Sequence, residues 1–388
     1  MIISIDLGSD SSKCVVFLPD SIICFQDANH FSSTLSAEFD RLTRAMHIIT
    51  NHVGCGTNRC SQLIISTSWP SWVALDSKYQ PVEYFRFDDG RYAQPKAVNP
   101  TEFPASCQLE YRKECVRQSG ISATSFVPLG TFLNSKLTGT QPLIDQMIWR
   151  YGRSENPSTQ SIGFAMPHDK VGEILEIDCV PKMFHGSQLL LGTGDTIAAK
   201  HASESLFGSR HHCEIGTTPI MVSGDLAAGD IAVAGSMPNF IKSAAELLLQ
   251  NASQDRSYFN KILDKFEVLD RSITPIRYSI DVDEYGVTDL SSGKVTIEPE
   301  HINIGNLTLF NHCLKFLAAE VGKVFCNQRI SVGGSIACSS IFQKYLSLQK
   351  VNVLGGNQYM TAIGGLLFAG VTAASLKSSN LNILEKPQ

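Results

Sequence analysis

The stretch IISIDLGSDSSKCVVFL, residues 2–18, decides the fold of this chain. Apolar and polar residues alternate up to Asp6, and an apolar run resumes at Cys14, so the pattern predicts two strands, residues 1–6 and 13–18. Glycine, serine and aspartate lie between them, as is typical of tight turns. Two strands joined by such a turn form a β-hairpin, whereas a phosphate-binding P-loop leads from a strand into a helix. The stretch therefore predicts a hairpin and excludes a P-loop here.

A second stretch in the other half of the chain repeats this pattern. Residues 214–219, EIGTTP, lie between two short strand candidates, residues 212–213 and 220–222. The glycine of this stretch, Gly216, follows Gly8 by about half the chain length. A glycine at a hairpin tip lets backbone N–H groups approach an anion, and neighbouring hydroxyls donate further hydrogen bonds. We therefore expect two similar domains whose hairpin tips face one phosphate chain; two unrelated glycine turns are the alternative.

Composition narrows the class of protein. The chain has 388 residues, of which 43% are hydrophobic, enough for one large or two ordinary globular domains. A net charge of −5 with 18% charged residues argues against nucleic acid as a partner. The N-terminal residues predict no secretory leader, and the longest nearly apolar run, residues 362–374, is shorter than the roughly 20 residues of a membrane span. Eleven cysteines without a C-x-x-C pair favour reduced thiols, so we expect a cytoplasmic protein without membrane contact.

Helical and strand patterns alternate along the chain, which predicts an α/β protein. Buried strands are expected at residues 62–66 and 72–75. Helices are expected at residues 36–51, 244–250, 257–269, 307–325, 339–348 and 360–374.

An acidic residue follows a third apolar strand. Residues 189–200, LLLGTGDTIAAK, predict a strand, a glycine turn and then a helix rich in small residues. Asp195 at this turn is placed to accept a proton from an attacking hydroxyl group; the alternative is that it caps the helix. Asp6, at the end of the first strand, is placed to hold hydrated Mg²⁺, which prefers carboxylate and water oxygens.

Two further glycine pairs lie near the C-terminus. Residues 330–335, ISVGGS, predict a strand and a turn at which a ligand ring lies against the backbone. Gly364 and Gly365 lie on a predicted helix, where close helix packing without a ligand is equally compatible with them. The sequence His211-His212-Cys213 indicates a strand at a sheet edge rather than a metal site, because no further ligands have the required spacing.

The order of these segments resembles the FGGY carbohydrate kinases of the sugar kinase, Hsp70 and actin superfamily. Family members carry a DLGTTSVK-like turn, a GISGQMHGLVLLD-like segment, a tryptophan followed by a variable residue and Asp-Gly-Arg, a GxGD segment, a Gly-Thr-Ser hairpin, a GGGS turn and a final small-residue helix. The matching segments here are residues 6–13, 65–76, 87–91, 192–195, 216–218, 333–335 and 361–370. The resemblance runs from residue 1 to about residue 375.

This resemblance implies a fold and an activity. The fold is α/β, with two similar ribonuclease H-like domains of the actin/Hsp70 ATPase type around a central cleft. Residues 1–208 would form the N-terminal domain with the sugar site and the catalytic base, and residues 209–388 the C-terminal domain with the nucleotide site. The activity is transfer of the ATP γ-phosphoryl group to a hydroxyl of a sugar.

The resemblance also implies a role for each matching residue. Asp195 would be the catalytic base, and Asp6 would place Mg²⁺. The residues that would hold the phosphates are Gly8, Ser9, Ser11, Lys13, Gly216, Thr217 and Thr218. Those that would border the adenosine are Gly333, Gly334 and Ser335, and those that would face the sugar are Trp69, Asp89 and Arg91.

The Asp-Gly-Arg segment favours the ketose branch of the family, xylulokinase-like or sedoheptulokinase-like, so xylulose, sedoheptulose and ribulose are the expected acceptors. Ser68, Trp69 and Pro70 replace the Gln-Met-His stretch that contacts the sugar in xylulokinases, and Phe87 replaces the tryptophan before Asp-Gly-Arg. Two other classes are alternatives: a catalytically degenerate sugar- or nucleotide-binding protein, and an actin- or Hsp70-like ATP-driven switch. A homodimer is compatible with the family.

Overall fold

The structure is a computed structural model. The residues that it describes are 1–8, 11–28, 34–54, 59–68, 71–86, 116–142, 170–215, 219–226, 230–236, 278–281, 286–289, 304–334, 336–337 and 339–379.

The first hairpin opens a six-stranded sheet with the order β3-β2-β1-β4-β9-β8. Its strands are β1 (Ile2–Leu7), β2 (Ser11–Leu18), β3 (Ser21–Ala28), β4 (Gln62–Thr67), β8 (Lys170–Glu173) and β9 (Gln188–Leu190). The strands β1, β2 and β3 run antiparallel, while β4 is parallel to β1 and β9 is parallel to β4. The predicted hairpin is therefore confirmed.

A second sheet of five strands repeats this arrangement with the order β12-β11-β10-β15-β16. Its strands are β10 (His211–Ile215), β11 (Pro219–Asp225), β12 (Asp230–Ser236), β15 (Arg329–Gly333) and β16 (Asn352–Asn357). The strand β10 pairs antiparallel with β11 and parallel with β15, as β1 does with β2 and β4. The predicted duplication is therefore confirmed, and the alternative of two unrelated turns is wrong.

The central place of β10 corrects one prediction. The segment His211-His212-Cys213 was expected at a sheet edge, but β10 lies between β11 and β15 in the middle of its sheet. His212 is completely buried there. A polar ring is compatible with this position because other side chains provide its hydrogen bonds.

One long helix follows the three antiparallel strands in each half. Helix α1 (Leu35–Val53) follows β3, begins at the N-cap Thr34 and buries Leu42, Ala45 and Ile49 in the core of the first sheet. Helix α7 (Ile304–Phe325) follows β12 and buries Leu317 and Val321 in the core of the second, together with α8 (Ser340–Leu348). These helices confirm the expectations at residues 36–51, 307–325 and 339–348. The expected helices at residues 244–250 and 257–269 lie outside the described residues.

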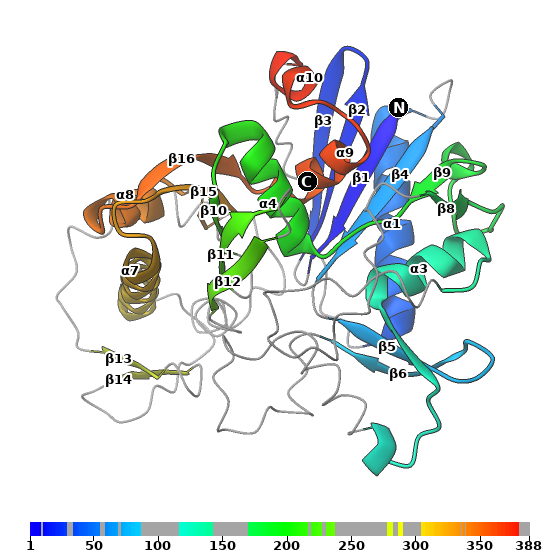
Figure 1. Ribbon diagram of the computed structural model, residues 1–388, viewed down its shortest axis with the longest axis horizontal. Coiled ribbons are helices and arrows are strands. Elements are labelled where there is room, and N and C mark those ends of the chain that lie inside the picture. The colour runs from blue at the N-terminus through cyan, green and yellow to red at the C-terminus, as the bar shows by residue number, and fades with distance from the viewer. Residues whose placement is uncertain are drawn as a thin grey trace.

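In each half, one helix packs on the sheet of the other half. Helix α4 (Asp195–Phe207) follows the first sheet but packs on β10 and β11, and α9 (Met360–Phe368) follows the second sheet but packs on β1 and β4 (Figure 1). A Cβ atom on Gly364 would lie 1.8 Å from the carbonyl oxygen of Ala198 in α4, and one on Gly365 would lie 2.1 Å from Oγ of Ser4 in β1. These glycines therefore serve close packing.

The predicted helix at residues 360–374 is divided. Helix α9 ends at Phe368, Gly370 adopts a positive φ of 88°, and α10 (Ala373–Ser378) begins after its N-cap Thr372. The left-handed backbone at Gly370 ends the first helix, which apolar spacing alone does not reveal.

Smaller elements complete the described part. A three-stranded sheet has the order β6-β5-β7 and contains β5 (Trp72–Leu75), β6 (Pro81–Phe85) and β7 (Ser125–Pro128). Further elements are helix α3 (Leu129–Thr138), the 3₁₀ turn Lys182–Phe184 and the pair β13 (Tyr278–Asp281) and β14 (Gly286–Asp289). Among the described residues, no helix combines the length and the apolar character that crossing a membrane requires. The predicted domain boundary at residue 208 falls at Gly208, the C-cap of α4, and stays a prediction.

Candidate functional site

Two of the predicted site residues meet at one edge of the first sheet. The parallel strands β1, β4 and β9 all end there, and Asp6 of β1 lies beside Ser66 of β4 in register. The next residue of β4, Thr67, forms a bridge to Gly194, directly before Asp195. Carboxyl ends of parallel strands are where α/β sheets commonly bind ligands. The structure thus brings Asp6 and Asp195 to the same edge.

Asp6 is a buried carboxylate with one unsatisfied oxygen. The residue is 2% exposed, its Oδ2 lies 4.0 Å from Nζ of Lys13, and its Oδ1 has no hydrogen-bond partner among the described residues. Burial raises the pKa of Asp6 to about 6, against the charge of Lys13, and the negative charge of Glu214 adds to the rise. A carboxylate oxygen that no group in the described part of the chain satisfies fits a hard divalent cation.

The turn after Asp6 is held from outside the hairpin. Arg41 of α1 is buried and donates to the carbonyl oxygen of Gly8. A Cβ atom on Gly8 would lie 3.1 Å from the carbonyl oxygen of Ser11, so this turn leaves little room for a side chain. Ser11 itself is buried at the start of β2. The turn's backbone is therefore anchored close to Asp6.

Arg41 is in turn fixed by a carboxylate that the sequence analysis did not select. Its Nη1 donates to Oε2 of Glu38 over 2.7 Å, and the Tyr84 hydroxyl donates to Oε1 of Glu38 over 3.2 Å. A sequence signal exists, because Glu38 occupies a position on the apolar stripe that continues through Leu42 and Ile49. A carboxylate on the buried face of a helix needs a partner that compensates its charge. Here that partner is Arg41, which also donates to the turn after Asp6.

Asp195 is the first residue of α4, and the N-cap is Gly194. Its side chain is half-buried, and Oδ1 accepts from the backbone N–H of Thr196 over 2.7 Å. The preceding turn lies tightly against β4, since a Cβ atom on Gly192 would lie 1.6 Å from the carbonyl oxygen of Ile65. The glycines before Asp195 thus allow the close approach that places this carboxylate at the sheet edge.

The predicted adenosine turn lies against the second hairpin. A Cβ atom on Gly333 would lie 1.8 Å from Oε2 of Glu214, and one on Gly334, which has a φ of 89°, would lie 2.2 Å from the carbonyl oxygen of Ile215. The glycine pair therefore lets the end of β15 approach the end of β10. Glu214 was not among the predicted site residues. A sequence signal for it exists, because it precedes the glycine of the second hairpin as Asp6 precedes the glycine of the first.

Eight predicted site residues lie outside the described residues, and their roles stay predictions: Ser9, Trp69, Asp89, Arg91, Gly216, Thr217, Thr218 and Ser335. Within the described part of the chain, no group of three or more histidine, cysteine and acidic side chains forms a ready metal cluster. Two kinds of carboxylate remain: Asp6, buried and suited to a cation, and Asp195, half-buried and suited to accepting a proton.

Comparison with solved structures identifies the fold. The xylulose kinase from Rhodospirillum rubrum is similar with a TM-score of 0.61 at 15% identity, over 99% of this chain and 93% of that chain. The ligand-bound xylulose kinase from Lactobacillus acidophilus has a TM-score of 0.60 at 12% identity, over 98% and 91%. The glycerol kinase from Plasmodium falciparum, solved with ADP, has a TM-score of 0.59 at 12% identity, over 99% and 93%. No protein-family model and no curated protein matches the chain by sequence.

These similarities confirm the predicted fold class, the two-domain ATPase fold of sugar kinases. The resemblance seen in the motifs is thus confirmed for the fold.

Proposed function

We propose that this protein transfers the γ-phosphoryl group of ATP to a hydroxyl group of a small sugar. The observation that carries the proposal is the meeting of Asp195 and Asp6 at one edge of the first sheet, through the bridge from Thr67 to Gly194. Phosphoryl transfer depends mainly on positioning and on charge stabilisation. A base for the acceptor hydroxyl and a carboxylate for the cation are the two groups that this chemistry needs.

The residues have separate roles in this proposal. Asp195 accepts the proton of the acceptor hydroxyl, at the N-terminal end of α4, where the helix dipole favours a carboxylate. Asp6 would hold Mg²⁺, which neutralises phosphate charge when bound. Gly8, Ser11 and Lys13, with the undescribed Ser9, would bind phosphates from the first hairpin.

The second half of the chain supplies the other ligand contacts in this proposal. Gly216, Thr217 and Thr218 would bind phosphates from the second hairpin, and Gly333 and Gly334, with Ser335, would border the adenosine. The close packing of Gly334 on the carbonyl oxygen of Ile215 supports a common site for both turns. Residues 1–208 and 209–388 would be the two domains that the substrates bring together.

We infer that the acceptor is a ketose, with xylulose, sedoheptulose and ribulose as candidates. Trp69, Asp89 and Arg91 would face it. Support for a ketose comes from the Asp-Gly-Arg segment at residues 89–91. The strand β6, which precedes this segment, is anchored near the phosphate turn, because Tyr84 donates to Glu38, which pairs with Arg41. Similar folds act on chemically different acceptors, since xylulose, gluconate and glycerol kinases are all among them.

Acceptor-dependent ADP release tests the proposal. The purified protein is assayed with Mg²⁺ and ATP against xylulose, ribulose, sedoheptulose, gluconate, glycerol and no acceptor. We expect one ketose to stimulate turnover and Asp195→Asn to lower it roughly 100- to 10,000-fold. The matched control is Asp178→Asn, which makes the same chemical change at an exposed turn, and it should leave turnover unchanged.

Other outcomes would point to the other classes. ATP hydrolysis that no acceptor stimulates, and that Asp195→Asn leaves intact, would contradict the kinase proposal and identify an ATP-driven switch. Nucleotide binding without any turnover would identify a degenerate binding protein.

A further inference from the structure

Arg41 contacts two acceptors at once from the buried face of α1. Its Nη1 donates to Oε2 of Glu38 over 2.7 Å, and its Nη2 donates to the carbonyl oxygen of Gly8. The side chain is buried, so the guanidinium group contacts protein rather than solvent. Burial raises the pKa of Asp6, and the charge of Arg41 acts against that rise. The cation therefore lies close to the start of the first hairpin turn.

A second residue holds the carbonyl group directly before that of Gly8. Both the backbone N–H and the hydroxyl of Ser68 donate to the carbonyl oxygen of Leu7 over 3.3 Å. Two successive carbonyl groups at the start of the turn are thus fixed from two separate parts of the chain. Because the C=O and N–H groups of a trans peptide unit are coplanar and point in opposite directions, fixing these carbonyls also fixes the N–H group on the far side of each.

The carboxylate that pairs with Arg41 is itself held by strand β6. The Tyr84 hydroxyl donates to Oε1 of Glu38 over 3.2 Å and also bonds with the side chain of Ser71. All of these side chains are buried. Burial raises the pKa of Glu38, and the charges of Arg41 and Arg86 act against this rise. Two cations therefore compensate the buried carboxylate.

These contacts connect the turn with both segments that lead to the predicted acceptor residues. Ser68 and Ser71 lie on either side of Trp69, and Arg86 directly precedes residues 87–91. The network crosses from β6 through α1 to the hairpin turn by way of buried side chains. A buried polar network whose members satisfy one another rigidifies the groups that it joins.

We propose that Arg41 is a positioning residue that holds the turn after Asp6 in the conformation that receives phosphates, and that Glu38 and Tyr84 hold Arg41 for this purpose. The inference deepens the proposed function and rests on it for the identity of the turn's ligand. Arg41 performs this role without touching the ligand, because a preformed backbone removes the free-energy cost of ordering the turn on binding. Nucleotide phosphates then bind more tightly, whereas the adenosine, which the second half of the chain would contact, gains nothing from Arg41.

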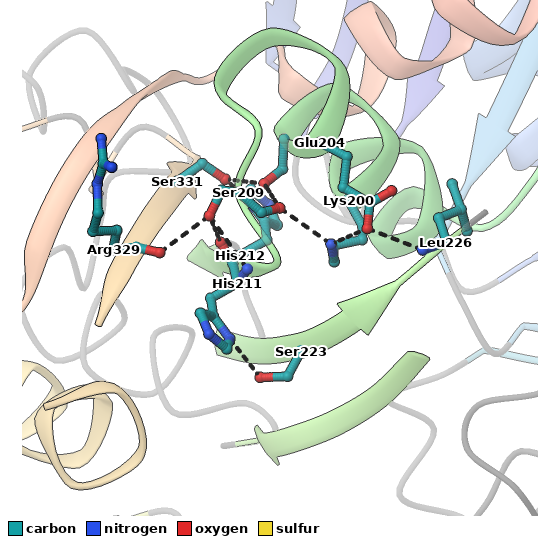
Figure 2. Close-up of polar contacts among 10 residues, drawn as sticks. Lys200, Glu204, Ser209, His211, His212, Ser223, Leu226, Arg329 and Ser331 are labelled. Carbon is teal, nitrogen blue, oxygen red and sulfur yellow. Dashed lines mark hydrogen bonds and ion pairs between the residues drawn. The ribbon is translucent and has the colours of Figure 1, made fainter. Parts of the chain in front are cut away.

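Lys200 of α4 forms a matched arrangement elsewhere in the fold. It is completely buried, pairs with Glu204 and donates to the carbonyl oxygen of Ser209 over 3.3 Å (Figure 2). Ser209 precedes β10, so this carbonyl lies at the end of the strand opposite to the second hairpin turn. A cation, a carboxylate and a backbone carbonyl are joined as they are at Arg41, but not at a hairpin turn.

Calorimetric titration with ADP in the presence of Mg²⁺ tests the proposal without any turnover, and the affinity for adenosine is measured by its displacement of ADP. Arg41→Met combined with Glu38→Gln removes the cation together with its partner's charge, so no unpaired carboxylate stays buried. We expect this double variant to weaken ADP binding roughly 10- to 100-fold and to leave adenosine binding within about twofold of the wild type. The matched control, Lys200→Met with Glu204→Gln, should change neither affinity.

Two further variants examine how Arg41 is held. Tyr84→Phe should weaken ADP binding about 2- to 5-fold, because one hydrogen bond to Glu38 is lost. The same change should have no further effect in the double variant, because Tyr84 acts through Glu38 and Arg41. Arg41→Lys keeps a charge beside Glu38 but replaces two nitrogens, each on its own acceptor, by one ammonium group. It should also weaken ADP binding selectively, and it provides the test if circular dichroism shows that the double variant is unfolded.

The outcomes separate this inference from the kinase proposal. Unchanged ADP binding in the folded Arg41 variants, or an equal loss of ADP and adenosine binding, would overturn the inference. If an acceptor stimulates the wild type while these variants bind ADP normally, the kinase proposal stands and the inference fails. If they lose ADP binding selectively in a protein that no acceptor stimulates, Arg41 positions the turn and the kinase proposal fails.

Discussion

Replacement of Asp6 by asparagine tests whether this carboxylate is kept at a cost to stability. The side chains have the same shape, but asparagine is neutral at every pH. Asp6 is 2% exposed and one of its oxygens has no hydrogen-bond partner in the described part of the chain. The wild type therefore carries a poorly compensated charge at neutral pH that the variant lacks.

The pKa of Asp6 gives the expected size of the effect. Burial raises it from 3.8 to about 6, and since a tenfold change in an equilibrium constant is about 1.4 kcal/mol, this corresponds to roughly 3 kcal/mol. A carboxyl group with a higher pKa in the folded state favours folding below pH 3.8 and loses that contribution as the pH rises through 6. As the pH rises through this window, the ionisation of Asp6 should lower the free energy of unfolding of the wild type by about 3 kcal/mol in total. About 2 kcal/mol of this loss should occur above pH 4.5.

Urea denaturation of the wild type and Asp6→Asn, followed by circular dichroism in the presence of a chelator, measures this difference. The other titrating groups are common to both proteins and cancel when the two free energies of unfolding are subtracted. We expect the advantage of the variant to grow by about 2 kcal/mol from pH 4.5 to pH 8. The same variant should lose Mn²⁺ binding, so stability and cation binding change in opposite directions.

A difference between the two proteins that stays constant from pH 4.5 to pH 8 would refute the reasoning. It would mean that Asp6 ionises as it does in the unfolded chain, and hence that another group compensates its charge.

Three further predictions concern residues of the helices α4 and α9. Gly364→Ala places a methyl group 1.8 Å from the Ala198 carbonyl oxygen, so urea denaturation should show a loss of about 1–3 kcal/mol; an unchanged midpoint would contradict this packing. Lys200→Met removes the ammonium group that pairs with Glu204 and should cost about 2 kcal/mol, less than a fully buried pair because Glu204 is partly exposed; the double variant with Glu204→Gln should recover part of it. Burial lowers the pKa of His201 from 6.5 to about 4, so stability should fall as the pH drops through this range; His201→Phe should flatten that part of the thermal unfolding profile, and equal slopes would exclude the histidine as the cause.

Much of the fold can be predicted from the sequence because its signals are local. Alternation over residues 2–18 predicts the first hairpin, and the repeat at residues 214–219 predicts the second; both are present as β1–β2 and β10–β11. Strand and turn patterns depend on neighbours two to four residues away. The division between α9 and α10 was missed because it depends on the left-handed backbone at Gly370, which the apolar spacing does not encode.

The candidate site was predictable only in part. Asp6 lies at the end of one recognisable strand and Asp195 follows another, so their carboxylates could be selected from the sequence. Glu214 has a sequence signal in its place in the second hairpin, although it was not selected. Arg41 could not be selected in the same way, because its significance lies in contacts with the carbonyl oxygen of Gly8 and, through Glu38, with Tyr84. Those contacts join residues whose approach depends on how the strands are ordered.

The sequence by itself determined the two glycine hairpins, the acids beside them and the small-residue helices, since each is a pattern of adjacent residues. Only the tertiary structure decided that α4 packs on the second sheet and α9 on the first. That exchange turns Ser4 and His212 toward the same helix pair, and the carboxylates two residues further along each strand share those faces. The physical reason is that burying apolar faces selects partners from the whole chain, whereas hydrogen bonding in a turn selects them from its immediate neighbours.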